Sequence, residues 1–324
     1  MGIRHLNKYL LDKCSTSSIK QIHLSKLKDK TIVIDTSIYL YKFIGDGLLE
    51  ENLYIFITTL QKYNINALFV FDGVPPQEKW NTIETRNKEK DQAEVMYDNL
   101  SQKLSTSQYN DDERKKIMSQ MQTVKKQCIR IKKHHIAFAK KLMEVMGIKY
   151  INAIGEADEI CAKMCKSNIA FGCLSDDMDM FTYGCSNILR NLNLLKEEVT
   201  IYNYETIISD LQLTSTTFRI LLIISTNDYN DQDDNNFNKS IKLYNEYKST
   251  DHTNISFKTW LEEHVCHLSN TKDINHFERI YNLDNYIDVN VNNLNETSCK
   301  EDKIKYYNEL QTIMKPHGFI FLNN

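Results

Sequence analysis

Short apolar runs that each end in an acidic residue recur between residues 31 and 179 of the chain. The run TIVID ends at Asp35, LFVFD ends at Asp72, and IAFGCLSDDMD ends with Asp177 and Asp179. Such runs, rich in Val, Ile and Phe, are typical of buried strands in a parallel sheet. Because ligands of open α/β sheets gather at the carboxyl ends of the strands, the pattern predicts an α/β protein with an acidic site at that edge.

Helical periodicity fills the segments between these runs. Residues 31–35, 52–63 and 67–72 form a predicted strand–helix–strand unit with a right-handed crossover. The alternation predicts a mostly parallel central sheet flanked by helices. The other predicted helices cover residues 5–14, 37–44, 134–147, 155–166, 204–213, 214–225 and 239–248, and the other predicted strands cover a short segment after Gly147 and residues 169–175, 186–192 and 197–203.

Residues 78–133 break this alternation, because they are charged, rich in Gln and Ser, and nearly free of strand pattern. We interpret them as helices inserted between two halves of the sheet domain. Between Arg114 and Lys133 there are eight lysines or arginines and no acid, which fits either a solvated surface helix or a contact with a phosphodiester backbone. The predicted parts are an N-terminal half (1–110), an internal half (111–250) and a C-terminal helical tail (251–324).

The overall composition is that of an ordinary globular protein, with 41% hydrophobic and 26% charged residues and a net charge of -3. Whole-molecule charge therefore does not indicate a nucleic-acid partner. The eight cysteines include no CxxC pair, so Cys161 and Cys165 are expected to be buried, reduced thiols. No apolar stretch reaches the roughly 20 residues of a membrane span, and the first residues lack a signal-peptide apolar region. We expect an intracellular protein that does not enter a membrane.

Acidic residues that follow apolar segments are the strongest chemical signal in the chain. Carboxylate oxygens are the ligands that hard divalent cations such as Mg²⁺ and Mn²⁺ prefer. Two such ions about 3.5–4 Å apart can activate water and stabilise the departing oxygen of a phosphoryl displacement. We therefore predict a site for two Mg²⁺ ions, for which Mn²⁺ can substitute, with the candidate ligands Asp35, Asp72, Glu156, Asp158, Asp177, Asp179 and Asp228.

Two pairs of these acids carry geometric requirements. Asp177 and Asp179 are two residues apart, so an extended strand exit would place both side chains on one face. Inside a helix, Glu156 and Asp158 would point about 200° apart. They can converge only if Glu156 lies at the helix entrance, where Gly155 permits a turn and the helix dipole favours acids.

Several segments, in order along residues 1–250, resemble the XPG-type structure-specific 5′ nucleases, and in particular their flap endonuclease branch. These segments are MGI, VIDTS, FVFDGVPPQEK, MGIKYINAIGEADEICA, SDDMDMFTYG and LLIISTNDY, of which the third and fifth are highly specific. The resemblance implies a PIN-like nuclease fold that carries a helical arch and a helix-two-turn-helix DNA-binding element.

The resemblance also implies catalytic roles. The acids named above become metal carboxylates, and Asp158 stands where the family usually has Glu, so its contact with the metal is expected to pass through water. Lys79 and Arg86 match basic residues at the base of the arch that grip the scissile phosphate. A spacing of seven residues would place them on one helical face. Without the DGVPPQ context, the pair would be interpreted as solvated surface charges.

Further matches imply DNA-binding residues. Tyr41 matches an aromatic ring that stacks on a base beside the cut, although a half-buried core tyrosine is an equal alternative. Gly2 matches an N-terminus that packs near the site, and Lys239 matches a phosphate-contacting lysine. Arg130 and Lys132 would lie on the far leg of the arch, along a threaded single strand. The family's glycine-rich turn is replaced here by DQDDNNFNKS, whose acids would repel a phosphate.

The predicted function is a Mg²⁺-dependent 5′ nuclease in DNA replication and repair, which cuts a 5′ flap near the junction of single strand and duplex. A 5′→3′ exonuclease on DNA or RNA is the alternative within the enzymes, and a non-catalytic DNA-binding replication subunit is the alternative outside them. The partner is branched double-stranded DNA, and the chain carries no recognisable sliding-clamp motif. We expect a monomer that acts in the nucleus or at a cytoplasmic replication site. The abundance of Asn, Ile, Lys and Tyr suggests an A/T-biased coding sequence, and hence a large DNA virus or protist version.

Overall fold

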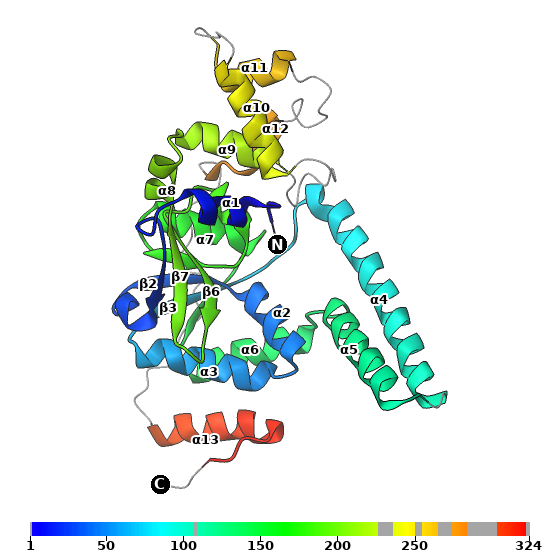
Figure 1. Cartoon of the computed structure of the whole chain (residues 1–324). Coiled ribbons are helices and arrows are strands. Elements are labelled where there is room, and N and C mark those ends of the chain that lie inside the picture. Colours follow the sequence, from blue (N-terminus) through cyan, green and yellow to red (C-terminus); the bar gives the residue numbers. More distant parts are fainter. Residues whose placement is uncertain are drawn as a thin grey trace.

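A central sheet with helices on both faces forms the body of the protein, and a long helical hairpin stands away from it (Figure 1). The computed structural model describes residues 2–106, 109–225, 236–249, 255–264, 274–283 and 303–321. Within these ranges no helix has both the length and the apolar character that a membrane span requires.

The sheet contains seven strands within the described residues, in the order β1-β7-β6-β5-β2-β3-β4. The strands from β6 to β4 run parallel to one another, whereas β7 pairs antiparallel with both β6 and β1. The predicted mostly parallel sheet is therefore confirmed. The strands are β1 (Ile19–His23), β2 (Thr31–Asp35), β3 (Asn66–Phe71), β4 (Lys149–Asn152), β5 (Gly172–Leu174), β6 (Asn187–Asn193) and β7 (Glu198–Asn203).

The helices follow the predicted periodic segments closely, including the long charged segment between the two halves of the sheet. Short 3₁₀ helices connect several of them, and these were not predicted. The α-helices are α1 (Leu6–Lys13), α2 (Thr36–Asp46), α3 (Leu49–Lys62), α4 (Trp80–Thr106), α5 (Asp111–Gln127), α6 (Lys133–Val145), α7 (Ala157–Lys166), α8 (Tyr204–Asp210), α9 (Ser215–Ile223), α10 (Phe237–Ser249), α11 (Phe257–His264), α12 (Ile274–Ile280) and α13 (Lys303–Met314), and the 3₁₀ helices are η1 (Leu24–Leu27), η2 (Gln77–Lys79), η3 (Met178–Phe181) and η6 (Lys315–His317).

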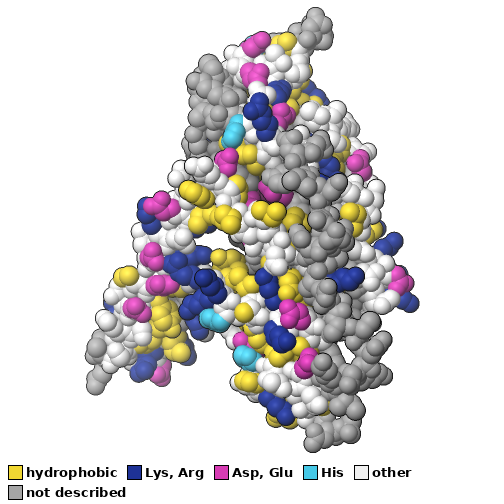
Figure 2. Space-filling view, turned by 180° about the vertical axis from the view of Figure 1, so that it is seen from behind, with side chains coloured by type: hydrophobic (Ala, Val, Ile, Leu, Met, Phe, Trp, Pro, Cys, Tyr) yellow, Lys and Arg dark blue, Asp and Glu magenta, His cyan; other side chains and the backbone are white. Residues whose placement is uncertain are grey.

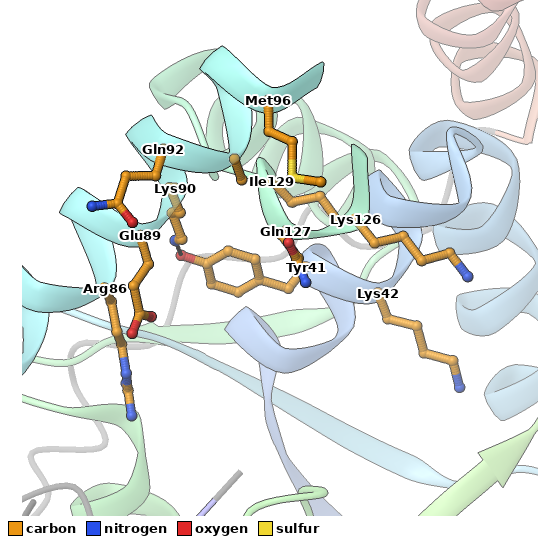
Figure 3. Close-up of a pocket in the computed structure, with 11 residues that line it drawn as sticks. Tyr41, Lys42, Arg86, Glu89, Lys90, Gln92, Met96, Lys126, Gln127 and Ile129 are labelled. Atoms are coloured by element: carbon orange, nitrogen blue, oxygen red, sulfur yellow. Dashed lines mark hydrogen bonds between the residues drawn. The ribbon is translucent and has the colours of Figure 1, made fainter. Parts of the chain in front are cut away.

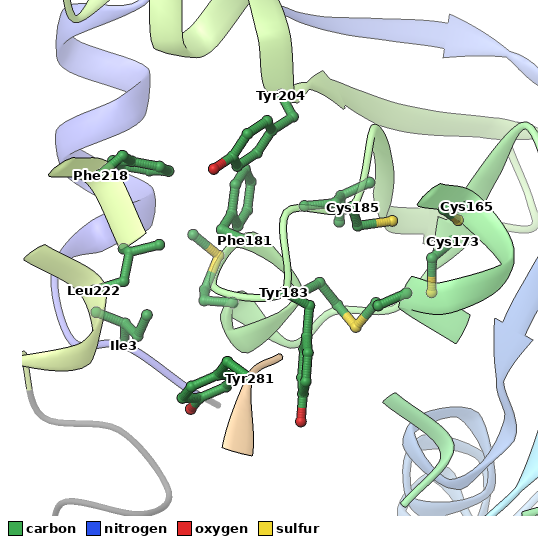
Figure 4. Close-up of a cluster of buried hydrophobic side chains, with 14 of the residues drawn as sticks. Ile3, Cys165, Cys173, Phe181, Tyr183, Cys185, Tyr204, Phe218, Leu222 and Tyr281 are labelled. Atoms are coloured by element: carbon green, nitrogen blue, oxygen red, sulfur yellow. The ribbon is translucent and has the colours of Figure 1, made fainter. Parts of the chain in front are cut away.

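Alternating strand side chains build one hydrophobic core on each face of the sheet. On β2, Val33 belongs to the first core, whereas Ile32 and Ile34 belong to the second. The first core includes side chains of α1, α7, α8 and α9 (Figure 4), and the second includes side chains of α2, α3, α6 and α13. Burial on both faces explains why the parallel strands are nearly continuous apolar runs.

Strand β1 at the edge of the sheet was not predicted. Its sequence, IKQIH, has only two apolar residues, and three of its five side chains are exposed. It forms because Ile19 to His23 pair with Tyr202 to Glu198 of β7, a partner almost 180 residues away. Tertiary pairing, and not local pattern, therefore defines this strand.

Helices α4 and α5 form the hairpin that projects from the body (Figure 1). The side chain of Asn110 accepts a hydrogen bond from the Glu113 backbone N–H at 2.9 Å, and the Glu113 side chain accepts one from the Asn110 N–H at 3.1 Å. This capping box starts α5. A small hydrophobic cluster centred on Ala93, Leu100 and Val124 joins the two helices.

Two helices lie where the helix-two-turn-helix element was predicted. Helix α9 contacts α10, and the buried hydroxyls of Ser225 and Ser240 lie 2.8 Å apart between them. Residues 226–235, which connect the two helices, lie outside the described residues. Farther along the chain, α13 buries Leu310 and Met314 in the second core, against α6. The boundaries of the three predicted parts stay a prediction.

Candidate active site

Four neighbouring parallel strands each lead to an acidic residue at the same edge of the sheet. In the order β5-β2-β3-β4, the strands lead to Asp177, Asp35, Asp72 and Glu156. Successive strands extend in one direction from β2 to β4, whereas β5 and β6 lie on the other side of β2. The acids therefore flank the position where the strand order reverses, which is where α/β sheets bind ligands.

Hydrogen bonds from the starts of two helices hold Asp35 and Asp72 in place. Asp35 is the N-cap of α2, and its Oδ1 accepts a hydrogen bond from the Ser37 backbone N–H at 3.2 Å. The Asp72 carboxylate accepts hydrogen bonds from the Ser37 hydroxyl and, at 2.8 Å, from the Ala157 N–H at the start of α7. Burial, followed by the charges of Asp72 and Asp177, raises the pKa of Asp35 well above its usual value.

Gly73 allows the loops after β3 and β4 to meet. Its N–H donates to the Gly155 carbonyl at 2.7 Å, and a Cβ atom at this position would lie 2.2 Å from the Ala153 carbonyl oxygen. No larger residue fits without moving backbone. This close approach holds Asp72 beside the entrance of α7.

Glu156 is the N-cap of α7 and has an extended backbone, which confirms its predicted place at the helix entrance. Gly155 does not have a positive φ, so the turn does not depend on glycine in the way that we expected. The Glu156 carboxylate pairs at 2.7 Å with the ammonium of Lys79, and both side chains are largely buried. Burial lowers the pKa of Lys79, but nearby carboxylates, Glu156 first, outweigh burial and raise the pKa above its usual value.

Asp158 lies in the first turn of α7, and its charge is poorly compensated. Burial is the largest cause that raises its pKa well above the usual value, and the charges of Asp35 and Asp177 add to the rise. Lys79 opposes this effect only in part. The Oδ1 atom of Asp158 is buried and has no hydrogen-bond partner among the described residues.

Asp177 and Asp179 do not leave an extended strand, and that prediction was wrong. Asp177 caps the 3₁₀ helix η3, and its Oδ1 accepts a hydrogen bond from the Asp179 N–H at 3.0 Å. Gly2 lies directly against both acids, because a Cβ atom on Gly2 would lie 2.3 Å from Asp177 Oδ1 and 2.9 Å from Asp179 Oδ1. The predicted place of the chain's N-terminus beside the acids agrees with this contact.

Sequence reasoning missed the residues that hold the acidic loop after β5. The Ser175 hydroxyl donates to Asp35 Oδ2 at 3.4 Å and accepts from the Asp177 N–H at 3.2 Å. The buried guanidinium of Arg190 donates to the Asp176 carbonyl and to Asn7 Oδ1, each at 2.8 Å. Ser175 lies two residues before Asp177, which was an available signal; Arg190 lies within an apolar strand and gave none.

The acids fit a hard divalent cation in kind, since all of them offer carboxylate oxygens, and Asp158 Oδ1 is buried without a hydrogen-bond partner among the described residues. Within the part of the chain that the structure describes, no three acidic, histidine or cysteine side chains already form a ligand set. Asp228, the seventh predicted ligand, lies outside the described residues. Metal binding at this site therefore stays a proposal.

A cavity of about 860 Å³ lies between α2 and the helical hairpin. Tyr41 projects into it from α2, and the Lys90 ammonium lies 4.9 Å from the centre of the tyrosine ring and donates to its hydroxyl at 3.2 Å (Figure 3). Arg86 lines the same cavity and extends away from the ring (Figure 3). Lys79 lies in η2, just before α4 begins, so the two basic residues do not share one continuous α-helix.

The lining of this cavity is rich in cations, because Lys42 and Lys126 join Arg86 and Lys90. Figure 2 shows lysine and arginine side chains gathered beside a hollow on this face of the molecule. Tyr41 is half-buried at the cavity wall, so it can meet a ligand. Its predicted stacking role stays open.

The other predicted DNA contacts lie at the end of the hairpin and at the starts of α6 and α10. Arg130 forms ion pairs with Asp91 at 2.6 Å and Glu94 at 3.2 Å, and thereby ties the end of the hairpin to α4. Lys132 is exposed at the start of α6, and its N–H donates to His135 Nδ1 at 3.1 Å. Lys239 is exposed in the first turn of α10. Their predicted DNA contacts stay predictions.

Family comparisons agree with this geometry. Residues 1–93 match the XPG N-terminal domain and residues 147–228 match the XPG I-region, so the two matches include the strands that carry the acids. The chain belongs to the XPG family. The hairpin helix α5 lies between the two matched regions.

Individual relatives belong to the same family of endonucleases. Flap endonuclease 1 of Lodderomyces elongisporus is 30% identical over 71% of this chain and 61% of its own length. A probable RAD2-like endonuclease of Invertebrate iridescent virus 6 is 28% identical over 71% of this chain and 68% of its own length. The chain thus spans less than two thirds of the length of the first of these relatives.

Two solved structures share the fold. The catalytic core of Rad2 in complex with DNA substrate superposes with a TM-score of 0.60 at 22% identity, over 97% of this chain and 94% of that one. Flap endonuclease-1 of Methanococcus jannaschii gives a TM-score of 0.57 at 19% identity, over 98% of this chain and 100% of that one. The predicted PIN-like nuclease fold is confirmed.

Proposed function

We propose that this protein is a Mg²⁺-dependent structure-specific 5′ nuclease that cuts DNA 5′ flaps near the junction of single strand and duplex. The proposal is carried by the set of acids at the ends of four adjacent parallel strands, together with a cavity between α2 and the helical hairpin that four lysine and arginine side chains line. The acids suit divalent cations, and the cavity suits a nucleic-acid strand. The relatives named above are endonucleases, which supports the same activity.

The acidic residues Asp35, Asp72, Glu156, Asp158, Asp177 and Asp179 would hold the cations, with Asp228 as a seventh candidate. Bound divalent cations would polarise the scissile phosphodiester and acidify the attacking water. The chain itself prepares the site: the hydrogen bonds of Ser37 and Ser175 hold Asp35 in place before substrate arrives. Preorganised charges of this kind stabilise a transition state more than mobile ones do.

Lys79 and Arg86 would supply positive charge to the phosphate. The Lys79 ammonium keeps its proton, because its neighbouring carboxylates raise its pKa. It can therefore neutralise negative charge that develops on phosphate oxygens, and Glu156 fixes its position at 2.7 Å. Arg86, on the first turns of α4, would orient the strand that enters the cavity.

A 5′→3′ exonuclease on DNA or RNA is the second candidate, because it would use the same acids. The hairpin of α4 and α5 favours flap cleavage, because a free 5′ strand could pass beside the lysine and arginine side chains that line its cavity. We propose that the protein acts as a monomer, at sites of DNA replication in the nucleus or the cytoplasm.

The test is cleavage of a 5′-labelled flap oligonucleotide with Mg²⁺, with EDTA as the metal-free control. The protein needs its native N-terminus, because Gly2 lies against two of the acids. We expect a cut at the junction, and slower cleavage of a blunt duplex and of single-stranded RNA. Preferred cleavage of the blunt duplex or the RNA would instead support the exonuclease.

Variants of the acids separate a catalytic role from a DNA-binding role. Asp177→Ala and Asp179→Ala should abolish cleavage, while both variants still bind the flap DNA in Ca²⁺. Asp12→Ala, on an exposed position of α1, is the matched control and should cleave normally. If the Asp177 and Asp179 variants were as active as the parent, the protein would not be the nuclease that we propose.

A further inference from the structure

Three large apolar side chains are exposed at the rim of the acidic site. Ile154 is 88% exposed, Val74 is 71% exposed and Trp80 is 56% exposed. Large apolar side chains that gather at one place on a surface usually mark a binding site. We call these three residues the apolar rim.

The backbone places each rim residue next to a member of the site. Val74 lies two residues after Asp72, and Ile154 lies two residues before Glu156. The Val74 N–H donates to the Ile154 carbonyl at 2.9 Å, so these two residues lie side by side.

Trp80 is fixed to the same place through its neighbour in sequence. It follows Lys79 directly, and Lys79 is buried and paired with Glu156 at 2.7 Å. Because Trp80 is the first residue of α4, its backbone is held both by this ion pair and by the helix. An exposed indole therefore lies at a defined position on α4, one residue after Lys79 and six residues before Arg86 of the cavity lining.

We propose that the apolar rim is a stacking surface for a nucleobase of the substrate strand, with Trp80 as its platform. This inference rests on the proposed function. Base faces are the apolar surfaces of a nucleic acid, and aromatic side chains bind them with little regard to sequence. The lysine and arginine side chains of the hairpin cavity, among them Arg86 farther along α4, would complement the phosphates of the same strand.

Stacking on Trp80 would position the strand as it leaves the acids and enters the hairpin. Tyr41 lies on α2 at the cavity wall, so the two aromatic residues would contact the strand from different elements. Trp80 is a positioning residue in this arrangement, because it holds a base and not the reacting phosphate.

Tryptophan fluorescence provides a direct test, because the chain has only two tryptophans. Trp260 is 6% exposed in a cluster of aromatic rings, so the exposed Trp80 is the one that can report on a bound base. The full chain is titrated with flap DNA in Ca²⁺, and fluorescence and anisotropy are recorded together. We expect quenching that follows binding, and no such quenching in Trp80→Phe.

Affinities of matched variants complete the test. Trp80→Ala should weaken flap binding by roughly 5- to 100-fold, which is the range for loss of one stacked base. Trp80→Phe keeps a ring and should stay within about 3-fold of the parent. Met118→Ala, an exposed apolar position on α5, should bind like the parent. Circular dichroism melts confirm that each variant is folded.

Each contrary result has a separate meaning. If flap DNA bound without a change in Trp80 fluorescence, and Trp80→Ala bound as tightly as the parent, the stacking surface would be refuted while the nuclease proposal stood. If quenching occurred but no substrate was ever cut in Mg²⁺, the nuclease proposal would fail while the stacking surface stood. A Trp80 signal that changed with protein concentration alone would refute stacking in favour of self-association.

Discussion

At the scale of single residues, the site depends on two glycines, because neighbouring atoms occupy the space that a side chain would need there. Gly73 and Gly2 stand where a Cβ atom would lie within 2.3 Å of backbone or of an acid. Their value here is the missing side chain, which lets two loops and the N-terminus reach the acids.

Gly73→Ala should therefore damage both stability and activity. Overpacking against the Ala153 and Ile154 carbonyls should cost about 1–3 kcal/mol. A shift of the loop that carries Asp72 by about 1 Å should slow flap cleavage by about 100-fold. Thermal melts and cleavage rates provide the measurements.

Gly47→Ala is the matched control for this variant. Gly47 has a φ of 73° but nothing lies near its missing Cβ atom, so alanine there should cost about 1–2 kcal/mol through backbone strain alone. Its rate of cleavage should equal that of the parent. Equal rates in both alanine variants would show that the contact at Gly73 does not position the site.

Asp158 carries the clearest conflict between stability and function. Its pKa in the folded protein lies above its unfolded value near 3.9, so the folded state binds this proton more tightly. Stability without divalent metal should therefore fall as the pH rises above about 4 and through the raised pKa, and it should stay low at neutral pH.

Asp158→Asn removes this charge and should raise the melting temperature in EDTA, by about 2–4 °C for each kcal/mol of relief. Mg²⁺ should stabilise the parent more than the variant. Melting curves at pH 5 and pH 8, with and without Mg²⁺, provide the test. Asp12→Asn on the exposed face of α1 should leave all four curves unchanged. If Asp158→Asn melted at a lower temperature than the parent in EDTA, the charge of Asp158 would not destabilise the metal-free protein.

At the scale of elements, the hairpin of α4 and α5 has little to hold it. Its cluster contains Ala93, Leu100 and Val124 as buried members, together with partly buried neighbours. Elements with few buried apolar contacts open locally at a low free energy. The hairpin should therefore open independently of the sheet.

Val124→Ala should loosen the hairpin without destabilising the body. Loss of two methyl groups costs about 1.5 kcal/mol, so limited proteolysis between residues 93 and 128 should become about 10-fold faster. The main melting transition should not move. Val33→Ala, in the first core, should instead lower the main transition. If Val124→Ala shifted that transition as much as Val33→Ala did, the hairpin would not be an independent unit.

Sequence patterns predicted the central elements because their signals are local. The runs TIVID and LFVFD predicted β2 and β3, and parallel pairing then placed Asp35 and Asp72 at one edge of the sheet. Strand β1 and the docking of α13 on α6 could not be predicted in this way, because each depends on a partner far along the chain. Strand β5 has only three residues, and the 3₁₀ helix η3 follows at Met178, so Asp177 and Asp179 do not lie on the extended strand that the sequence predicted.

At the scale of the whole molecule, charge is uneven although the net charge is only -3. Positively charged side chains line the cavity, whereas the acids lie at the edge of the sheet. These side chains are Lys42, Arg86, Lys90 and Lys126. A local positive surface of this kind attracts a phosphodiester backbone, and salt weakens that attraction.

Lys126→Ala should reduce the salt dependence of flap binding. If its ammonium contacts one phosphate, the slope of log K against log salt should become shallower by about 0.7–0.9. Lys62→Ala is the control, because Lys62, the last residue of α3, pairs with Glu197 and does not line the cavity. Identical slopes for both variants would remove the cavity from the proposed path of the strand.

The central claim is that separate acids at the carboxyl edge of the sheet hold divalent cations that cut DNA. The most direct measurement is anomalous diffraction from crystals of the protein soaked in Mn²⁺. We predict anomalous peaks beside the carboxylates of Asp35, Asp158 and Asp177, and the loss of those peaks in Asp177→Ala. Crystals that showed no peak among these oxygens, from a protein that still cut flap DNA in Mn²⁺, would contradict the account.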